Sequence, residues 1–423
     1  MKRLVVIGQG YVGLPMALRA VQKGFSVVGL DNKASLVEAL NAGRSHIDDV
    51  SDDDLKSGLV AGYSASTDAS CVADADVVVV CVPTPLSADG GPDLGAVESA
   101  ARTIGEHIQP NTLVILESTT YPGTTEEVFG PLVLGSNWQL GKDVNIAFSP
   151  ERIDPGNKTY GVQNTPKVVG GLTPECTRVA RDFYAEFIDT VVEAKGAKEA
   201  EMAKLLENTF RHVNIALVNE MLRFCDELDI DLWDAIDCAA TKPFGYMAFR
   251  PGPGVGGHCI PVDPSYLSHR VRAQLGYAFR MVELAEEINT AAPLYVASRL
   301  WRALNERKIA VNGAKVLLLG VTYKANISDR RESPAEPLAR RLLSWGAELS
   351  YHDPFVPVWS VEGDGHTTDL TSVEDVYEAC AVADIVVLLQ PHNQYDLRRL
   401  AGESRLILDT RGVTDVSDSV VHL

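Results

Sequence analysis

The chain has 423 residues, 46% of them hydrophobic and 22% charged, and a formal net charge of −19 at pH 7. This length exceeds one ordinary core and predicts at least two globular domains. The negative charge repels polyanions and argues against a nucleic-acid or anionic-membrane partner. No apolar stretch reaches the roughly 20 residues of a membrane helix, and no signal peptide follows the apolar run Leu4–Ile7, so we expect a cytoplasmic protein.

The first part of the chain alternates short β-branched runs with intervals of helical length. The expected strands are Leu4–Ile7, Val27–Leu30, Val77–Val82, Leu113–Leu116, Val144–Phe148 and Lys167–Gly170. Runs that are apolar on both faces and separated in this way predict a parallel, doubly wound sheet covered by helices. We place this Rossmann-like domain at residues 1–196.

Helical periodicity replaces this pattern over residues 197–307. The expected helix Ala200–Leu228 has one apolar stripe and a second half-apolar side, which suits packing against a twin in a homodimer or larger homo-oligomer. Alternation then returns in residues 308–423, with expected strands Val316–Gly320, Leu349–His352, Ile385–Leu389 and Leu406–Leu408. The predicted fold class is α/β: two Rossmann-like doubly wound domains joined by a central helical domain.

The motif Gly8-Gln9-Gly10-Tyr11-Val12-Gly13 follows an expected strand and opens an expected helix. Its glycines suit a tight turn, close approach to a pyrophosphate and helix–strand packing. Asp31 ends the next strand, where a carboxylate can bind the adenosine ribose and would repel a 2′-phosphate. The pair favours NAD over NADP, against the alternative of a merely structural glycine turn.

Small polar residues follow two further strands, in Val82-Pro83-Thr84-Pro85 and Glu117-Ser118-Thr119-Thr120. The carboxyl ends of parallel strands form the ligand crevice, so Thr84 and Thr119 are expected on the nicotinamide side, with Pro83 beside them. Ordinary strand-to-helix turn chemistry is the alternative.

A segment rich in glycine and proline, Pro251–Pro264, contains Cys259 next to His258 and near Asp263. Such a loop exposes backbone N–H groups and suggests a reactive thiolate, the alternative being one more buried thiol. The seven cysteines are scattered without a CxxC pair, so no metal site is expected. Lys204 and Asn208 lie four apart on the expected long helix and share one face, directed either to solvent or into a cleft.

These motifs together resemble the UDP-glucose/GDP-mannose dehydrogenase family over essentially the whole chain. The matching segments, in the same order, are Gly8–Gly13, Ser149-Pro150-Glu151-Arg152, Lys204 with Asn208, Gly256-Gly257-His258-Cys259 with Asp263, and Tyr323-Lys324 with Asp329-Arg330-Arg331-Glu332-Ser333. The resemblance implies oxidation of the C6 hydroxymethyl of a nucleotide-linked hexose to a carboxylate, with two NAD⁺ consumed.

The resemblance also implies catalytic roles. Cys259 would form a thiohemiacetal and then a thioester, and Glu151 would be the acid/base for its hydrolysis. Lys204 and Asn208 would stabilise the developing oxyanion. Asp263 would orient the cysteine loop, and Thr119 would lie near the nicotinamide and the water.

Substrate-binding and cofactor-binding roles follow in the same way. Lys324 resembles the family's substrate-binding lysine, and Arg331 an arginine that reaches the NAD, unless Asp329, Arg330 and Glu332 merely form a surface ion-pair cluster with it. Further substrate contacts are implied for Glu151, Arg152, Lys204, Asn208, Arg250, Gly256 and Arg411.

The form Pro150-Glu151-Arg152, with Pro243-Phe244-Gly245-Tyr246 and Arg250–Gly254, is similar to the UDP-N-acetylhexosamine 6-dehydrogenases. Pro155 stands where the UDP-glucose branch tends to carry a carboxylate. We therefore expect UDP-N-acetylglucosamine, then UDP-N-acetylmannosamine, as substrate, with UDP-glucose as the alternative. Outside this class, the alternatives are a two-electron hydroxy-acid dehydrogenase and a catalytically silent nucleotide-sugar binding protein.

Overall fold

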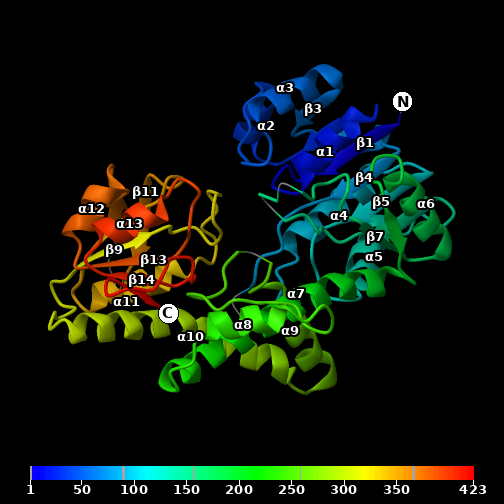
Figure 1. The fold of residues 1–423 in the computed structure, drawn as a ribbon. Helices are drawn as coiled ribbons and strands as arrows, with labels where there is room; N and C mark the ends of the chain where they lie inside the picture. Colours follow the sequence, from blue (N-terminus) through cyan, green and yellow to red (C-terminus); the bar gives the residue numbers. More distant parts are fainter. Residues whose placement is uncertain (1, 88–90, 155, 158, 258, 364–366) are drawn as a thin grey trace. The chain divides into compact units, whose positions relative to one another are not determined.

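The computed structural model describes residues 2–87, 91–154, 156–157, 159–257, 259–363 and 367–423 (Figure 1). The chain forms two compact units. The first unit is Met1–Glu207 with Ser265–Tyr277, and the second is Asn208–Pro264 with Ala278–Leu423. The division into three domains at residues 196 and 307 stays a prediction.

The first unit is built on an eight-stranded sheet. Its strands, in the order in which they lie, are β3 (Tyr63–Ser66), β2 (Ser26–Leu30), β1 (Arg3–Ile7), β4 (Val77–Val80), β5 (Thr112–Leu116), β6 (Val144–Phe148), β7 (Lys167–Gly171) and β8 (Val191–Glu193). The first six strands are parallel. All six strands expected from the sequence are present, within one or two residues at their ends.

Helices cover both faces of this sheet because its central strands are apolar on both sides. Val6 and Val79 belong to one buried cluster, with α1 (Gly13–Gln22), α2 (Ala34–Asn41), α3 (Asp52–Ala61) and α6 (Pro174–Tyr184). Val5 and Val78 belong to a second cluster, with α4 (Gly95–His107) and α5 (Gly130–Leu134). This alternation is the period of two that a strand imposes.

One strand corrects the sequence prediction. The run at Lys167 was expected in a parallel sheet, but β7 pairs antiparallel with β6, with Ala147 opposite Gly171 and Phe148 opposite Gly170. A parallel neighbour needs a crossover, usually a helix, and the described part of residues 149–166 forms none. The chain therefore turns back beside β6, and the first residue of β7 lies at the edge where β6 ends.

The second unit contains a smaller, parallel sheet. Its strands, in order, are β10 (Glu348–His352), β9 (Lys315–Leu319), β13 (Ile385–Leu388), β14 (Ile407–Asp409) and β15 (Val420–His422), and an antiparallel hairpin joins β11 (Val358–Glu362) to β12 (Thr367–Thr371). One face packs on α10 (Arg280–Glu306) and α11 (Ala335–Ser344), and the other on α12 (Val376–Val382) and α13 (Leu397–Glu403).

The helical region contains α7 (Ala197–Glu227), α8 (Leu232–Ala240), α9 (Asp263–Leu275) and α10. The expected helix at 200–228 is α7, three residues longer at its start. The predicted fold class, two doubly wound α/β parts joined by helices, is confirmed. In the part of the chain that the structure describes, no helix combines the length and apolarity needed to cross a bilayer.

Candidate active site

The turn between β1 and α1 has the geometry that a dinucleotide requires. Gly8 has a φ of +90°, and a Cβ there would lie 2.6 Å from the Cys81 carbonyl oxygen. A Cβ on Gly13 would lie 1.9 Å from the Gly8 carbonyl oxygen, whereas one on Gly10 would meet no atom within 4 Å. Packing thus demands Gly8 and Gly13, while Gly10 leaves open space for a pyrophosphate to approach the backbone. The turn fits NAD.

Asp31 follows β2 beside this turn. One carboxylate oxygen accepts a hydrogen bond from the Gln9 N–H at 3.0 Å, and the other accepts one from the Lys33 N–H at 3.0 Å. Gln9 is itself fixed, because its buried side chain accepts a 2.8 Å hydrogen bond from the Tyr63 hydroxyl. The carboxylate is therefore held against the glycine turn, where the ribose of a dinucleotide would bind.

The ends of β4 and β5 bring Thr84 and Thr119 together, as the sequence predicts for neighbouring parallel strands. The Thr84 hydroxyl donates a 2.8 Å hydrogen bond to the Thr119 carbonyl. The Thr84 carbonyl accepts one from the hydroxyl of Tyr266 on α9, a contact that the sequence did not suggest. Pro83, just before Thr84, lies in the same strand end.

Glu151 and Arg152 follow β6 in the first unit. One Glu151 carboxylate oxygen accepts a 2.7 Å hydrogen bond from the Arg152 N–H, and the Glu151 carbonyl accepts one from the Lys204 ammonium. Lys204 is buried on α7, which excludes the solvated alternative. The Arg152 guanidinium pairs with Glu207 at 2.7 Å. The sequence did not suggest Lys167, whose Nζ lies 3.6 Å from a Glu151 carboxylate oxygen.

The second unit holds the cysteine loop. Cys259 is exposed, and its carbonyl accepts a 3.0 Å hydrogen bond from the N–H of Asp263, the first residue of α9. The buried Asp263 carboxylate accepts a hydrogen bond from the Asn208 side-chain amide, and Arg211 donates to the Asn208 carbonyl oxygen. His258 lies outside the described residues. The loop is thus tied to α7 by an amide–carboxylate pair.

Two more hydrogen bonds hold this loop. The Gly252 N–H donates to the Asn219 side chain of α7 at 3.0 Å, and the Gly257 N–H donates to the Arg331 carbonyl at 2.9 Å. A Cβ on Gly256 would lie 2.6 Å from the Cβ of Tyr323. The glycines therefore allow close packing on the second sheet's edge, so the segment is fixed at both ends around the thiol.

Arg411 follows β14 and lies against the same loop. A Cβ on Gly252 would lie 2.9 Å from an Arg411 guanidinium nitrogen, and the Arg411 Nε–H donates to the Leu389 carbonyl at 2.7 Å. Burial lowers the pKa of Arg411 to about 10, so it remains a cation at neutral pH. Asp409 accepts hydrogen bonds from the N–H groups of residues 411–414 and fixes this turn.

The other expected cations of the second unit lie at its surface or strand ends. Arg331 pairs with Asp329 at 2.6 Å, the ion pair that the alternative reading expected. Arg250 pairs with Asp237 of α8. Lys324 follows β9, and its carbonyl accepts a 2.9 Å hydrogen bond from Thr322. Their roles toward a ligand stay predictions.

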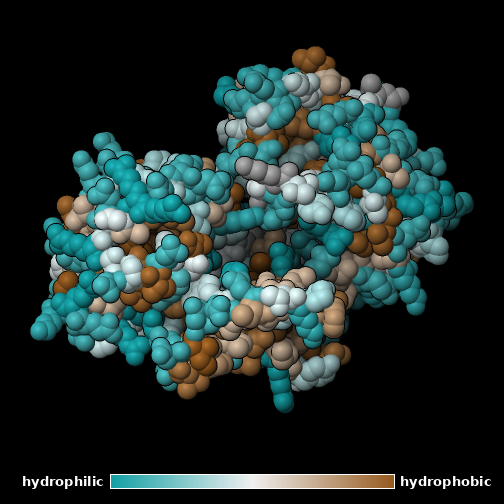
Figure 2. Space-filling model, in the orientation of Figure 1, coloured by the Kyte–Doolittle hydropathy of each residue, from teal (hydrophilic) through white to brown (hydrophobic). Residues whose placement is uncertain are grey.

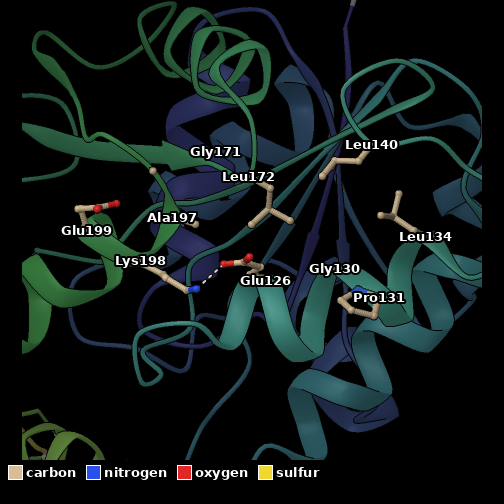
Figure 3. Close-up of a pocket in the computed structure, with 11 residues that line it drawn as sticks. Glu126, Gly130, Pro131, Leu134, Leu140, Gly171, Leu172, Ala197, Lys198 and Glu199 are labelled. Carbon is tan, nitrogen blue, oxygen red and sulfur yellow. Dashed lines mark ion pairs between the residues drawn. The ribbon is translucent and has the colours of Figure 1, made fainter.

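A pocket of about 310 Å³ in the first unit is distinct from these residues (Figure 3). Lys198 at the start of α7 and Glu126 form a 2.6 Å ion pair across it. Its apolar wall is made by Leu134, Leu140 and Leu172. No residue expected to be functional lines it, so we assign it no role.

The candidate residues thus divide between the two units. The first unit carries the glycine turn, Asp31, Thr84, Thr119, Glu151, Arg152 and Lys204, and the second carries Asn208, Arg250, Gly256, Cys259, Asp263, Lys324, Arg331 and Arg411. Among the residues that the structure describes, no group of three or more His, Cys, Asp or Glu side chains could hold a metal ion.

Comparison with known proteins agrees with this arrangement. The NAD binding, central and UDP binding domains of the UDP-glucose/GDP-mannose dehydrogenase family match residues 2–188, 198–291 and 317–416. The chain belongs to this family. It is an NAD-dependent nucleotide-sugar dehydrogenase.

Individual relatives match over nearly the full length. The UDP-N-acetyl-D-mannosamine dehydrogenase of Salmonella typhimurium is 34% identical, over 96% of this chain and 98% of its own. The UDP-N-acetyl-D-glucosamine 6-dehydrogenase of Pseudomonas aeruginosa is 33% identical, over 100% and 99%. The solved UDP-D-ManNAc dehydrogenase of Pyrococcus horikoshii superposes with a TM-score of 0.88 at 30% identity, covering 99% of this chain and 98% of its own.

Proposed function

We propose that the protein oxidises the C6 hydroxymethyl of a UDP-N-acetylhexosamine to the carboxylate, with Cys259 as covalent nucleophile. The observation that carries this proposal is the cysteine loop of the second unit. The buried Asp263–Asn208 pair and two main-chain hydrogen bonds fix a loop whose thiol is exposed. An exposed thiol in a fixed loop is the setting of a reactive cysteine, whereas structural thiols are buried and inert.

The chain's residues divide the chemistry as follows. NAD⁺, when bound at the glycine turn, would supply the oxidant for each of two successive two-electron steps. Lys204 and Asn208 stabilise negative charge on the C6 oxygen when the alcohol loses its proton. The Cys259 sulfur then adds to the aldehyde carbon, and the thiohemiacetal so formed still has a C–H bond to oxidise.

The second oxidation leaves a thioester on Cys259. Glu151 takes a proton from water, the oxygen attacks the thioester carbon, and the carbon–sulfur bond breaks to release the carboxylate and the thiol. Asp263 holds the loop during these steps, and Thr119 adjoins the water. In total, one alcohol, two NAD⁺ and one water give one carboxylate, two NADH and three protons.

The remaining residues bind the two ligands. Gly8, Gly10, Tyr11, Val12, Gly13, Asp31, Pro83, Thr84, Thr119 and Arg331 are assigned to NAD, and Arg152, Arg250, Gly256, Lys324 and Arg411 to the UDP-sugar. Cations near the diphosphate offset the acidic surface of this chain. The matched UDP binding domain, residues 317–416, supports the assignment of Lys324 and Arg411.

The N-acetylated sugar is supported by two observations. The segments Pro150-Glu151-Arg152 and Pro243–Tyr246 have the form of that branch, and the relatives quoted above carry the names of N-acetylhexosamine dehydrogenases. Pro155, which in the sequence disfavours UDP-glucose as substrate, lies outside the described residues. Discrimination is assigned to residues 151–157 and 246–254.

We expect two NADH per sugar and a higher kcat/KM for UDP-N-acetylglucosamine or UDP-N-acetylmannosamine than for UDP-glucose. A pocket built around a 2-hydroxyl rejects a bulkier acetamido group, whereas a pocket opened and lined by less polar residues accepts it. We therefore expect a clear preference for the N-acetylated sugars over UDP-glucose. The measurement is NADH formation at limiting sugar, with GDP-mannose as a control. A higher kcat/KM for UDP-glucose contradicts the sugar assignment, one NADH per sugar contradicts four-electron chemistry, and none contradicts catalysis.

We further propose that the chain forms a homodimer through its helices. Within the second unit, Phe210, Leu217 and Phe224 of α7 are each 45–53% exposed. Their spacing of seven residues places them on one helical face. Figure 2 shows apolar side chains also gathered over the surface that carries α8 and the adjoining part of α10. A stripe this long is unusual for a monomer's surface.

The expected mass in solution is at least twice that of one chain. Light scattering measures it directly, and the double change Leu217→Glu with Phe224→Glu should yield monomers, because charges cannot be buried in an apolar interface. The matched control, Leu217→Met with Phe224→Leu, keeps the face apolar and should stay dimeric. A monomeric unmodified protein at working concentration refutes the proposal.

A further inference from the structure

We propose that Lys167 is a positioning residue for the Glu151 carboxylate, and that Glu117, which shares the same ammonium, sets how strongly Lys167 holds it. This inference rests on the acid/base role proposed above for Glu151. Lys167, Glu117 and Glu151 belong to three adjacent strands or strand ends of the first sheet, and none of the motifs in the sequence includes Lys167 or assigns a role to Glu117.

The register of the sheet creates this arrangement. Phe148, the last residue of β6, lies opposite Gly170 in the antiparallel pairing, so the residues that follow β6 leave it beside the start of β7, where Lys167 lies. Opposite charges that meet at neighbouring strand ends attract. The Lys167 Nζ lies 3.6 Å from the Glu151 carboxylate and 3.0 Å from that of Glu117, which follows β5. One ammonium thus bridges two carboxylates.

The side chains of this charged cluster are almost fully buried. The side chains of Lys167 and Glu117 are 8% and 0% exposed, and that of Glu151 is 13% exposed. Burying charges is expensive, and an apolar group of similar volume usually serves stability as well or better. Stability alone therefore does not explain a buried lysine at the first position of an otherwise apolar strand.

A fourth residue fixes the far side of the cluster. The buried Tyr184 hydroxyl of α6 donates a hydrogen bond to the other Glu117 oxygen. The Lys167 Nζ also lies 5.2 Å from the centre of the Tyr184 ring, within reach of a cation–π interaction. Both Glu117 oxygens are therefore engaged, and the ammonium has little freedom to move away from Glu151.

The Glu151 carboxylate is held from two directions as a result. One oxygen accepts hydrogen bonds from the N–H groups of Arg152 and Ile153, and the other faces Lys167. A base with a fixed plane and a fixed charge can aim one oxygen at a water molecule.

The charges around Glu151 come from several elements. Lys167 of β7 lies 3.6 Å from the Glu151 carboxylate, Glu117 after β5 shares that ammonium, and the Lys204 ammonium of α7 donates to the Glu151 main chain. Arg152 is neutralised by Glu207. The Cys81 thiol after β4 also acts on this cluster, and burial raises its pKa, so it stays neutral.

The Lys167 ammonium lies nearer to the Glu117 carboxylate, at 3.0 Å, than to the Glu151 carboxylate, at 3.6 Å. Burial lowers the pKa of Lys167, but the Glu117 and Glu151 carboxylates outweigh this effect and the net shift is upward. Burial also raises the pKa of Glu117, although the Lys167 ammonium acts in the opposite direction. Lys167 is therefore positively charged at neutral pH. The charge of Glu117 changes how strongly Lys167 attracts the Glu151 carboxylate.

The test measures the decay of the covalent enzyme–sugar adduct after a single turnover, by rapid quench and intact mass, across pH. Hydrolysis needs ionised Glu151 and is lost as pH falls. Lys167→Met removes the cation that lies 3.6 Å from the Glu151 carboxylate and should move this acidic limb to higher pH by about one unit or more. Glu117→Gln removes the competing anion and should move the limb to lower pH.

A matched control is available in the same unit. Lys198→Met breaks a 2.6 Å surface ion pair with Glu126 (Figure 3) and should leave the limb unchanged. The thermal shift produced by NAD⁺ reports whether each variant is folded, and Glu117→Gln tests the coupling even if Lys167→Met does not fold. If these ion pairs served only stability, both variants would be less stable, and the acidic limb of adduct hydrolysis would stay at the same pH in each.

Two outcomes separate the inference from the proposed function. If Glu151→Gln hydrolyses the adduct normally, or no adduct forms at Cys259, the proposed function fails. If Glu151→Gln accumulates the adduct but Lys167→Met keeps the unmodified protein's limb, the function stands and the positioning role is overturned. A limb that moves upward in both variants overturns the part assigned to Glu117.

Discussion

Replacing Cys259 by alanine is expected to lower acid formation by at least about a thousandfold, because in the proposed mechanism the Cys259 sulfur holds the aldehyde as a species that still carries an oxidisable C–H bond. Binding of NAD⁺ and of the UDP-sugar should be nearly unchanged. Cys259 is exposed, and the main-chain and Asp263 contacts that hold its loop do not involve the sulfur.

The measurement combines calorimetric binding of each ligand with chromatographic detection of the uronic acid. Cys238→Ala is the matched control, since Cys238 is also an exposed thiol in the same unit, on α8. It should retain full turnover. Normal acid production by the Cys259 variant would end the covalent mechanism while leaving the family assignment untouched.

The second large effect concerns the cofactor. We expect kcat/KM with NAD⁺ to exceed that with NADP⁺ by about 100-fold or more, because a 2′-phosphate would meet the Asp31 carboxylate and like charges in contact cost several kcal/mol. The carboxylate cannot swing away easily. Its two oxygens are bound by the N–H groups of Gln9 and Lys33, each at 3.0 Å.

Steady-state kinetics with both cofactors tests this preference. Asp31→Ser should narrow the ratio by weakening NAD⁺ and relieving the repulsion of NADP⁺, whereas Glu38→Gln, an exposed acid on the nearby α2, should not change it. Equal kcat/KM for the two cofactors in the unmodified protein would contradict the role given to Asp31.

The elements that the sequence predicted well are those whose pattern is local. Runs such as Val77–Val80 are apolar on both faces, and only a strand in a covered sheet satisfies that composition. The strands that escaped prediction are short or polar edge strands: β3 (Tyr-Ser-Ala-Ser), β8, the β11–β12 hairpin and β15. Their formation depends on a neighbour that already exists.

The candidate site divides in the same way. The glycine turn and the cysteine loop are contiguous in sequence, so composition alone marked them. Lys167, Glu117 and Tyr184 come from three separate segments and meet only through strand pairing and the packing of α6. A lysine opening the apolar run Lys-Val-Val-Gly-Gly was the available signal, and it lacked meaning until the direction of β7 was known.

The reversal of β7 has a consequence for how this family can vary. In a purely parallel sheet only the last residues of strands reach the ligand edge, but an antiparallel neighbour delivers a first residue there as well. Insertions or deletions between Arg152 and Pro166 should leave the Glu151–Lys167 contact in place, because the paired residues of β6 and β7 lie outside that segment. A one-residue slip within β7 would turn Lys167 to the opposite face. The part of the sugar-choice segment that follows Arg152 can therefore change in length and composition without displacing the charge pair beside it.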